Sequence, residues 1–280
     1  MSSEFNPVEY KINTRINWNM IAPQYHNNWA ESDTGPFKST KELVKAAEIK
    51  PDDSVLDLAC GTGVVSKEIS QVLGDLGNLV GIDISRVALD IAKKSNQFKN
   101  VNFVEMDAEN LGFYANFDKM VCQYGLMFFP NTHKVLESIR NIMRKDGKIA
   151  ITVHGTQTGV PYFSCIMNSI LNYIPDIRPK GTPTVHRFGN PEDLQNEIST
   201  AGFSDIKIEK FTFMYNTGNF ETYWTDYLNS TANSIWPKIK TKGTMIINKI
   251  KNEAEKNTAQ FVKNGKIEFP WDVLIATAYK

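Results

Sequence analysis

The chain has 280 residues, of which 41% are hydrophobic, and its 31 Lys and Arg balance 31 Asp and Glu. This length and apolar content provide for one large core and exclude a disordered chain. The balanced charge excludes a global field that would draw the protein to nucleic acid, so no nucleic-acid partner is expected.

The cysteines and the N-terminus indicate a compartment. Cys60, Cys122 and Cys165 form no Cys-x-x-Cys pair and no metal-ligand spacing, which is typical of reduced cytoplasmic thiols and predicts no metal site. Residues 1–10 carry no apolar signal-peptide core, and the longest mostly apolar stretch, Tyr162–Ile174, is too short to span a bilayer. We therefore predict a cytoplasmic protein without a transmembrane segment, and the sequence does not indicate an oligomeric state.

A strand–helix alternation extends from about Asp53 to His154, after a predicted helical stretch. Helices are predicted within Tyr10–Ile49, where Ser39 or Thr40 can cap the segment Lys41–Ile49 ahead of Pro51. The predicted strands that follow are Ser54–Leu58, Asn78–Ile82, Val101–Met106, Lys119–Cys122 and Lys148–Val153. This alternation predicts a parallel sheet with helices on both faces.

Capping residues mark the helices between these strands. An apolar helical run starts at Val64 and stops at Gly74, Ser85 caps a second helix, and Asn131 caps a third that ends near Gly147. Downstream we predict helices over Pro161–Ile174, Pro191–Ala201, Phe220–Ser230 and Thr244–Lys263, a loop over Gly181–Arg187, and β runs over Ile206–Phe213 and Asp272–Ala278. The lysines of the last helix are interpreted as a solvated helix face.

Polar residues follow four successive predicted strands. The first strand runs through Asp57 into the turn Ala59-Cys60-Gly61-Thr62-Gly63, where glycine permits close approach of a ligand to backbone N–H groups at a helix start. Asp83 ends the second strand, where an acid can accept both hydroxyls of a ribose. Asp107 follows the third and can accept from an adenine amine, and Gln123-Tyr124 ends the fourth. The carboxyl edge of the sheet is therefore predicted to bind a nucleoside.

The charge at the turn separates two kinds of nucleoside ligand. Asp57 would repel a pyrophosphate but favour an ammonium, and opposite charges in contact are worth about 1–4 kcal/mol. A dinucleotide turn also requires a third small residue, Gly or Ala, at the position where this chain has Ser66. An NAD-dependent oxidoreductase is therefore the weaker alternative. A cofactor-binding regulatory protein without transferase activity stays open, because its binding turn would look the same.

These motifs resemble those of the class I S-adenosylmethionine-dependent methyltransferases. Within that class the chain is most similar to the small-molecule branch that includes the ubiquinone/menaquinone C-methyltransferases. The resemblance rests on Asp57–Gly63, Gly81–Asp83, Met106–Ala108, Phe117–Pro130, Phe188–Glu192, Ala201–Phe203 and Phe269–Leu274. The segment Ile21–Tyr25 is similar to the entry motif of the branch, but His26 stands where that motif has an acid.

The resemblance implies a Rossmann-like α/β fold with a seven-stranded, mostly parallel sheet whose last strand, Asp272–Ala278, is antiparallel, with helices on both faces and a helical cap. It divides the chain into an N-terminal cap segment (1–50), a cofactor-binding core (51–155), and the last two strands with helical substrate-cap insertions (156–280). The implied cofactor is S-adenosyl-L-methionine. Its expected contacts are Tyr25, Asp57, Ala59, Gly61, Gly63, Asp83, Ile84, Asp107, Ala108, Gln123 and Tyr124, with Tyr25 and Tyr124 over the sulfonium.

The acceptor is expected to be a small organic molecule. His154, at the ligand edge of the fifth strand, and Tyr124 are the candidate catalytic residues, and His186 and Arg187 lie in a loop that can reach the acceptor. The cap segments Pro161–Pro175 and Phe213–Trp236 are rich in aromatic residues. These segments predict either a cap that binds an apolar, quinone-like acceptor or helix faces that only pack on the core.

Overall fold

The computed structural model describes residues 4–30, 35–114 and 116–280, so residues 31–34 of the predicted N-terminal helical stretch lie outside the described residues. The helices of eight or more residues are α1 (Pro7–Tyr25), α2 (Thr40–Ala47), α4 (Arg86–Ser95), α5 (Thr132–Ile142), α6 (Pro161–Tyr173), α7 (Pro191–Thr200), α8 (Phe220–Asn229) and α10 (Thr244–Thr258). Shorter helical segments are η1 (His26–Ala30), η2 (Gly35–Ser39), α3 (Val64–Ser70), η3 (Leu126–Phe128), α9 (Trp236–Lys240) and η4 (Ala259–Phe261).

The strands form one mixed sheet in the order β3-β2-β1-β4-β5-β8-β6. They are β1 (Ser54–Leu58), β2 (Asn78–Asp83), β3 (Val101–Glu105), β4 (Phe117–Gln123), β5 (Met143–His154), β6 (Ser204–Asn216), β7 (Val262–Lys263) and β8 (Lys266–Tyr279). Neighbours from β3 to β5 pair in parallel, and β8 is antiparallel to both β5 and β6. The predicted Rossmann-like sheet with an antiparallel last strand is confirmed.

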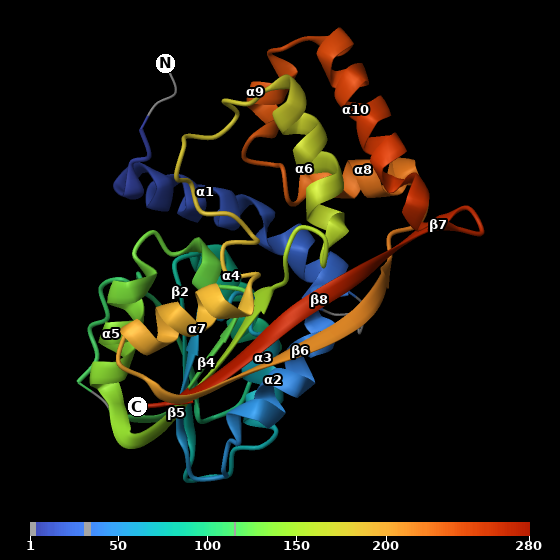
Figure 1. Cartoon of the computed structure of the whole chain (residues 1–280). Helices are drawn as coiled ribbons and strands as arrows, with labels where there is room; N and C mark the ends of the chain where they lie inside the picture. The colour runs from blue at the N-terminus through green and yellow to red at the C-terminus, as the bar shows by residue number, and fades with distance from the viewer. Residues whose placement is uncertain (1–3, 31–34, 115) are drawn as a thin grey trace.

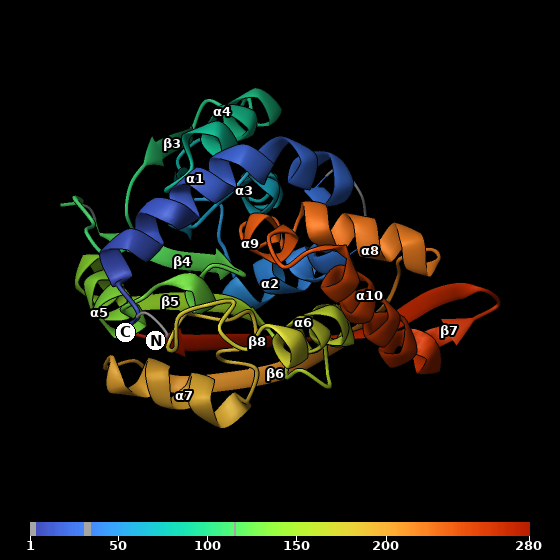
Figure 2. The same cartoon turned by 90° about the horizontal axis from the view of Figure 1, so that it is seen from above.

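Helices cover both faces of the sheet, while a group of helices lies beyond its carboxyl edge. Figure 2 shows α2, α3 and α4 on one face and α5 and α7 on the other. In Figure 1, α1 crosses above the carboxyl ends of the strands, and α6, α8, α9 and α10 gather at the same end. The ligand edge predicted from the sequence is therefore covered by helices from both ends of the chain.

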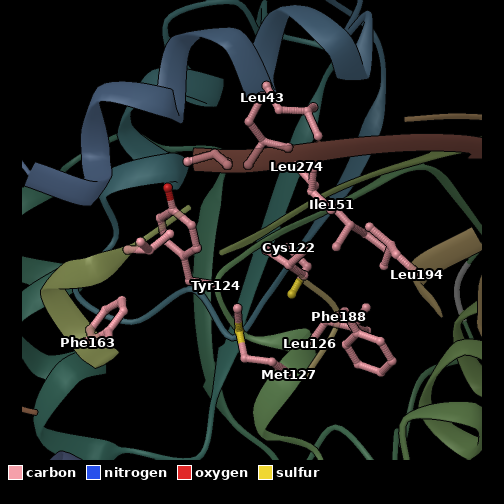
Figure 3. Close-up of a cluster of buried hydrophobic side chains, with 14 of the residues drawn as sticks. Leu43, Cys122, Tyr124, Leu126, Met127, Ile151, Phe163, Phe188, Leu194 and Leu274 are labelled. Atoms are coloured by element: carbon pink, nitrogen blue, oxygen red, sulfur yellow. The ribbon is translucent and has the colours of Figure 1, made fainter. Parts of the chain in front are cut away.

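The core fills the space between the sheet and its helices. Leu43 of α2, Cys122 of β4, Ile151 of β5, Leu274 of β8 and Leu194 of α7 are all buried and succeed one another across the layers (Figure 3). Burying such a side chain completely contributes about 1.5–3 kcal/mol, so this packing holds the strand ends at fixed positions. The thiol of Cys122 faces this core.

Several predicted element boundaries are wrong. The helix capped by Asn131 ends at Ile142 rather than near Gly147, because Met143 already pairs with Phe117 and opens β5. The first helix of the sheet region stops at Ser70 rather than at Gly74. The predicted helix Thr244–Lys263 ends at Thr258, and its last two residues form β7 against β8.

Candidate active site

A cavity opens at the carboxyl ends of β1 to β4, beneath α1. It encloses about 1100 Å³, counting its open mouth. Nine of the eleven predicted cofactor contacts line it, together with side chains from α1, η2 and η3 that the sequence did not single out. The nine are Tyr25, Ala59, Gly61, Asp83, Ile84, Asp107, Ala108, Gln123 and Tyr124.

The two glycines of the first turn have different physical roles. Gly61 and Gly63 both have positive φ, at 54° and 85°. A Cβ on Gly61 would meet no atom within 4 Å and would project into open space, whereas one on Gly63 would lie 2.5 Å from Nδ2 of Asn96. Gly61 therefore leaves room for a ligand. Gly63, which does not line the cavity, allows α3 to pack against α4.

Asp83 ties the turn to the second strand. Its Oδ2 accepts from the Gly61 N–H at 2.9 Å, and its Oδ1 accepts from the Ser85 N–H at 2.8 Å. Burial raises the pKa of this carboxyl, while the backbone N–H groups favour its ionised form. The result is an acceptor in the cavity wall where a ribose ring would present its hydroxyls.

Asp57 lies behind the turn rather than in the cavity wall. It is buried; its Oδ2 accepts from the Ser66 hydroxyl at 2.6 Å, and its Oδ1 has no hydrogen-bond partner. Burial raises its pKa to about 7, and the charge of Asp83 adds to the rise. An unpartnered buried acceptor is costly, so this site favours a cationic ligand group near the turn.

The third acid is held by a residue that sequence reasoning missed. Lys11 of α1 donates to Oδ2 of Asp107 at 2.7 Å and to Oε2 of Glu109 at 3.1 Å. Burial acts to raise the pKa of Asp107, but these contacts bring it below its usual value. Nothing in the local sequence marks Lys11, because it is separated from Asp107 by 96 positions.

A buried polar cluster supports the end of the fourth strand. The Ser39 hydroxyl lies 2.7 Å from the Tyr124 hydroxyl and accepts from Nε2 of Gln123 at 3.0 Å, while Thr40 donates to Oε1 of Gln123 at 3.0 Å. Ser39 is the N-cap residue of α2, as predicted, but its side chain forms no cap hydrogen bond. Both hydroxyls instead orient side chains of the cavity wall.

Tyr124 has a strained backbone, with φ of 56°. Such a conformation is unusual for a bulky residue and persists only where surrounding contacts impose it. Here the phenol donates to the Pro36 carbonyl at 2.8 Å, and the ring stacks on His154 with centroids 4.2 Å apart.

His154 lies behind Tyr124 and does not line the cavity. Its Nδ1 accepts from the indole N–H of Trp271 at 3.2 Å, and burial lowers its pKa well below the usual value. The ring is therefore neutral. In this position it contacts Tyr124 and lies out of reach of a ligand in the cavity.

Neither His186 nor Arg187 belongs to the lining of the cavity. Nδ1 of His186 lies 2.8 Å from the Gly155 carbonyl, and Nη1 of Arg187 donates to the Phe129 carbonyl at 2.6 Å. Arg187 thus holds the backbone of Phe129, a residue of the cavity lining. The aromatic residues in the cavity wall are Tyr10, Trp18, Tyr25, Phe37, Tyr124, Phe128 and Phe129.

The described part of the chain contains no group of three or more His, Cys, Asp or Glu side chains arranged to hold a metal ion. Within the same ranges no helix has the length and apolarity needed to cross a membrane. The site thus combines a glycine turn, three carboxylates on successive strands and an aromatic wall. The fold and this site define a Rossmann-like protein with a nucleoside-type cavity at the carboxyl edge of its sheet.

Comparison with known proteins identifies the family. Residues 49–182 match a family model described as a methyltransferase domain. The chain is 30% identical to the demethylmenaquinone methyltransferase of Lactobacillus johnsonii over 206 residues, covering 69% of this chain and 80% of the relative. The enzyme of the same name from Staphylococcus saprophyticus is 26% identical over 71% of this chain and 85% of its own length.

Solved structures show the same fold. Phosphoethanolamine N-methyltransferase 2 of Haemonchus contortus superposes with a TM-score of 0.60 at 16% identity, over 99% of this chain and 60% of that one. The chain belongs to the class I S-adenosylmethionine-dependent methyltransferases, and within them it resembles the demethylmenaquinone methyltransferases.

Proposed function

We propose that the protein transfers a methyl group from S-adenosylmethionine to an apolar, quinol-like acceptor. The observation that carries the proposal is the continuity of the cavity: one space joins the glycine turn and its carboxylates to a wall of Trp and Phe side chains. A flat aromatic acceptor fits such a wall, because aromatic rings gain from edge and offset contacts. The names of the demethylmenaquinone methyltransferases support the same acceptor class.

Each carboxylate suits one part of the cofactor. Asp83 would accept the ribose hydroxyls, Asp107 the adenine amine, and buried Asp57 would offset the positive ammonium. The unpartnered Oδ1 of Asp57 fits this assignment, because a cation nearby would relieve its burial. The cofactor supplies an already activated methyl group.

The residues at the end of β4 would position the reacting groups rather than move protons. Burial raises the pKa of both Tyr25 and Tyr124 above the usual value, so both phenols stay neutral. No histidine is among the described residues that line the cavity. We therefore assign His154 a positioning role through Tyr124. Orientation of an acceptor beside a methyl donor can contribute about 7–11 kcal/mol to lowering the barrier.

The test is methyl transfer from labelled S-adenosylmethionine to a panel of reduced demethylmenaquinone analogues, simple phenols, fatty acids and polar amines. We expect labelled product with the quinols, identified by mass. Activity on polar amines alone, or cofactor binding without transfer to any acceptor, would overturn the proposal. In the same assay His154→Phe should lower kcat and leave the shape of the pH profile unchanged, whereas a catalytic base would remove one limb of it.

A further inference from the structure

The outward face of α1 is apolar. Val8, Ile12, Ile16 and Met20 are spaced four residues apart and are 63%, 55%, 55% and 61% exposed. Residues four apart on a helix are neighbours, so these side chains form a row along the helix. Single exposed apolar residues are ordinary, but a contiguous row marks an interaction surface. We call it the α1 row.

The inward face of the same helix forms part of the active site. Tyr10, Lys11, Thr14 and Trp18 line the cavity. A surface helix usually places polar residues opposite its buried face. Here the wall of the acceptor cavity and an exposed apolar row therefore lie on opposite sides of one helix.

A basic segment lies at the same end of the molecule. Residues 227–252 contain five lysines and no acidic residue, although the whole chain is neutral. These lysines are Lys238, Lys240 and Lys242 in and after α9, and Lys249 and Lys251 in α10. Lys240, Lys242 and Lys249 are exposed, and Met245 among them is 71% exposed.

The loop 174–180 connects the basic segment to the start of α1, and both lie on the end face of the molecule beyond the carboxyl edge of the sheet. Lys238 of α9 donates to the Asp176 carbonyl at 2.6 Å. Burial raises the pKa of Tyr10 in α1, and the charge of Arg178 in this loop counters the rise. Lys180 forms a β-bridge with Glu4, just before α1. In Figure 2, seen from above, α1 and α9 both lie toward the viewer.

We propose that this face docks on the surface of an anionic lipid bilayer, with the α1 row entering the apolar layer and the α9–α10 lysines on the headgroup phosphates. Helices with exposed apolar residues beside clustered lysines bind at such interfaces. The inference rests on the proposed function in one respect, because an apolar quinol is dissolved in the bilayer and α1 is a wall of its cavity.

A second copy of the chain fits this face less well. A two-fold interface brings the same patch of both subunits together. The exposed lysines of one copy, Lys240, Lys242 and Lys249, would then lie close to those of the other, and residues 227–252 contain no acid to separate them. Anionic headgroups complement the same charges.

The experiment measures co-sedimentation of the full chain with vesicles of phosphatidylcholine that contain about one third phosphatidylglycerol, an anionic lipid that attracts lysines near the surface. We expect binding that weakens on pure phosphatidylcholine and in high salt. The variants Ile12→Ser/Ile16→Ser/Met20→Ser and Lys240→Glu/Lys242→Glu should each weaken binding at least about tenfold.

Matched controls lie at the opposite edge of the sheet. Leu76→Ser removes a side chain that is 87% exposed, and Lys145→Glu reverses an exposed charge, and neither should change binding. The inference is overturned if the wild-type protein does not bind anionic vesicles. It is also overturned if light scattering shows that the wild type is a dimer and that the α1-row variant is a monomer. Vesicle binding without quinol methylation would refute the proposed acceptor but leave the docking face standing.

Discussion

At the scale of single residues, the burial of Asp57 is expected to lower the stability of the ligand-free protein while it raises the affinity for the cofactor. Its folded pKa of about 7 lies above the unfolded value near 3.9, so between these values the unfolded chain has released a proton that the folded chain keeps. Ligand-free protein therefore loses stability as pH rises from about 4 to 7, by at most about 4 kcal/mol.

Asp57→Asn removes this titration. At about pH 8 the ligand-free variant should unfold at a higher temperature than the wild type, with the difference shrinking toward pH 4, while its affinity for S-adenosylmethionine falls. Thermal unfolding at several pH values and calorimetric titration measure the two effects. A variant that is less stable at every pH, with unchanged affinity, would contradict this account of the site.

The residues around Asp57 also show which contacts the sequence could predict. Acids at strand ends were recognisable because parallel strands bring their carboxyl ends to one edge. The roles of Ser39 and Lys11 could not be recognised. A serine before a helix predicts a helix cap, and a lysine in a helix predicts a solvent-exposed side chain. Their partners, Tyr124 and Asp107, lie 85 and 96 positions away. Contacts of that separation depend on how helices cross the sheet.

At the scale of elements, α1 is fastened over the cavity by ion pairs to the third strand region. Lys11 reaches Asp107 and Glu109, and Arg15 reaches Glu105 at 2.7 Å. Lys11→Ala should loosen the helix and weaken cofactor affinity several-fold, since a partly buried pair is worth about 1 kcal/mol. Hydrogen exchange of α1 should accelerate in the same variant.

Arg15→Ala is the matched control, because Arg15 is more exposed than Lys11 and does not line the cavity. It should change affinity less than about twofold, as exposed ion pairs contribute little. Equal effects of the two substitutions would show that α1 is held by overall charge rather than by the Lys11 contact.

Element boundaries were the least predictable part of the fold. Alternating strands and capped helices indicated the parallel core, since local periodicity determines those elements. β6 and β8 run well beyond the predicted Ile206–Phe213 and Asp272–Ala278, because their antiparallel pairing continues from Ser204 to Asn216. That pairing joins distant segments, and it leaves no local signal in either one.

At the scale of the whole molecule, ligand binding and folding are coupled, and this coupling tests the cofactor assignment directly. At a hundredfold excess over its dissociation constant, a ligand that binds only the folded state adds about 2.7 kcal/mol of stability. For a chain of this size that corresponds to a rise in Tm of about 5 °C or more. We expect this rise with S-adenosylmethionine and none with NAD, since the buried charge of Asp57, directly behind the turn, would repel a pyrophosphate bound against that turn.

Gly61→Val should abolish the rise, because its side chain would project into the space left for the ligand. Gly265→Val is the control for the backbone strain of a valine at positive φ. Gly265 lies in the β7–β8 hairpin with φ of 74°, and a Cβ there also meets no atom within 4 Å. Both variants should lose similar stability without ligand. Only Gly265→Val should regain it on adding S-adenosylmethionine, and an equal response of both would place the cofactor away from the turn.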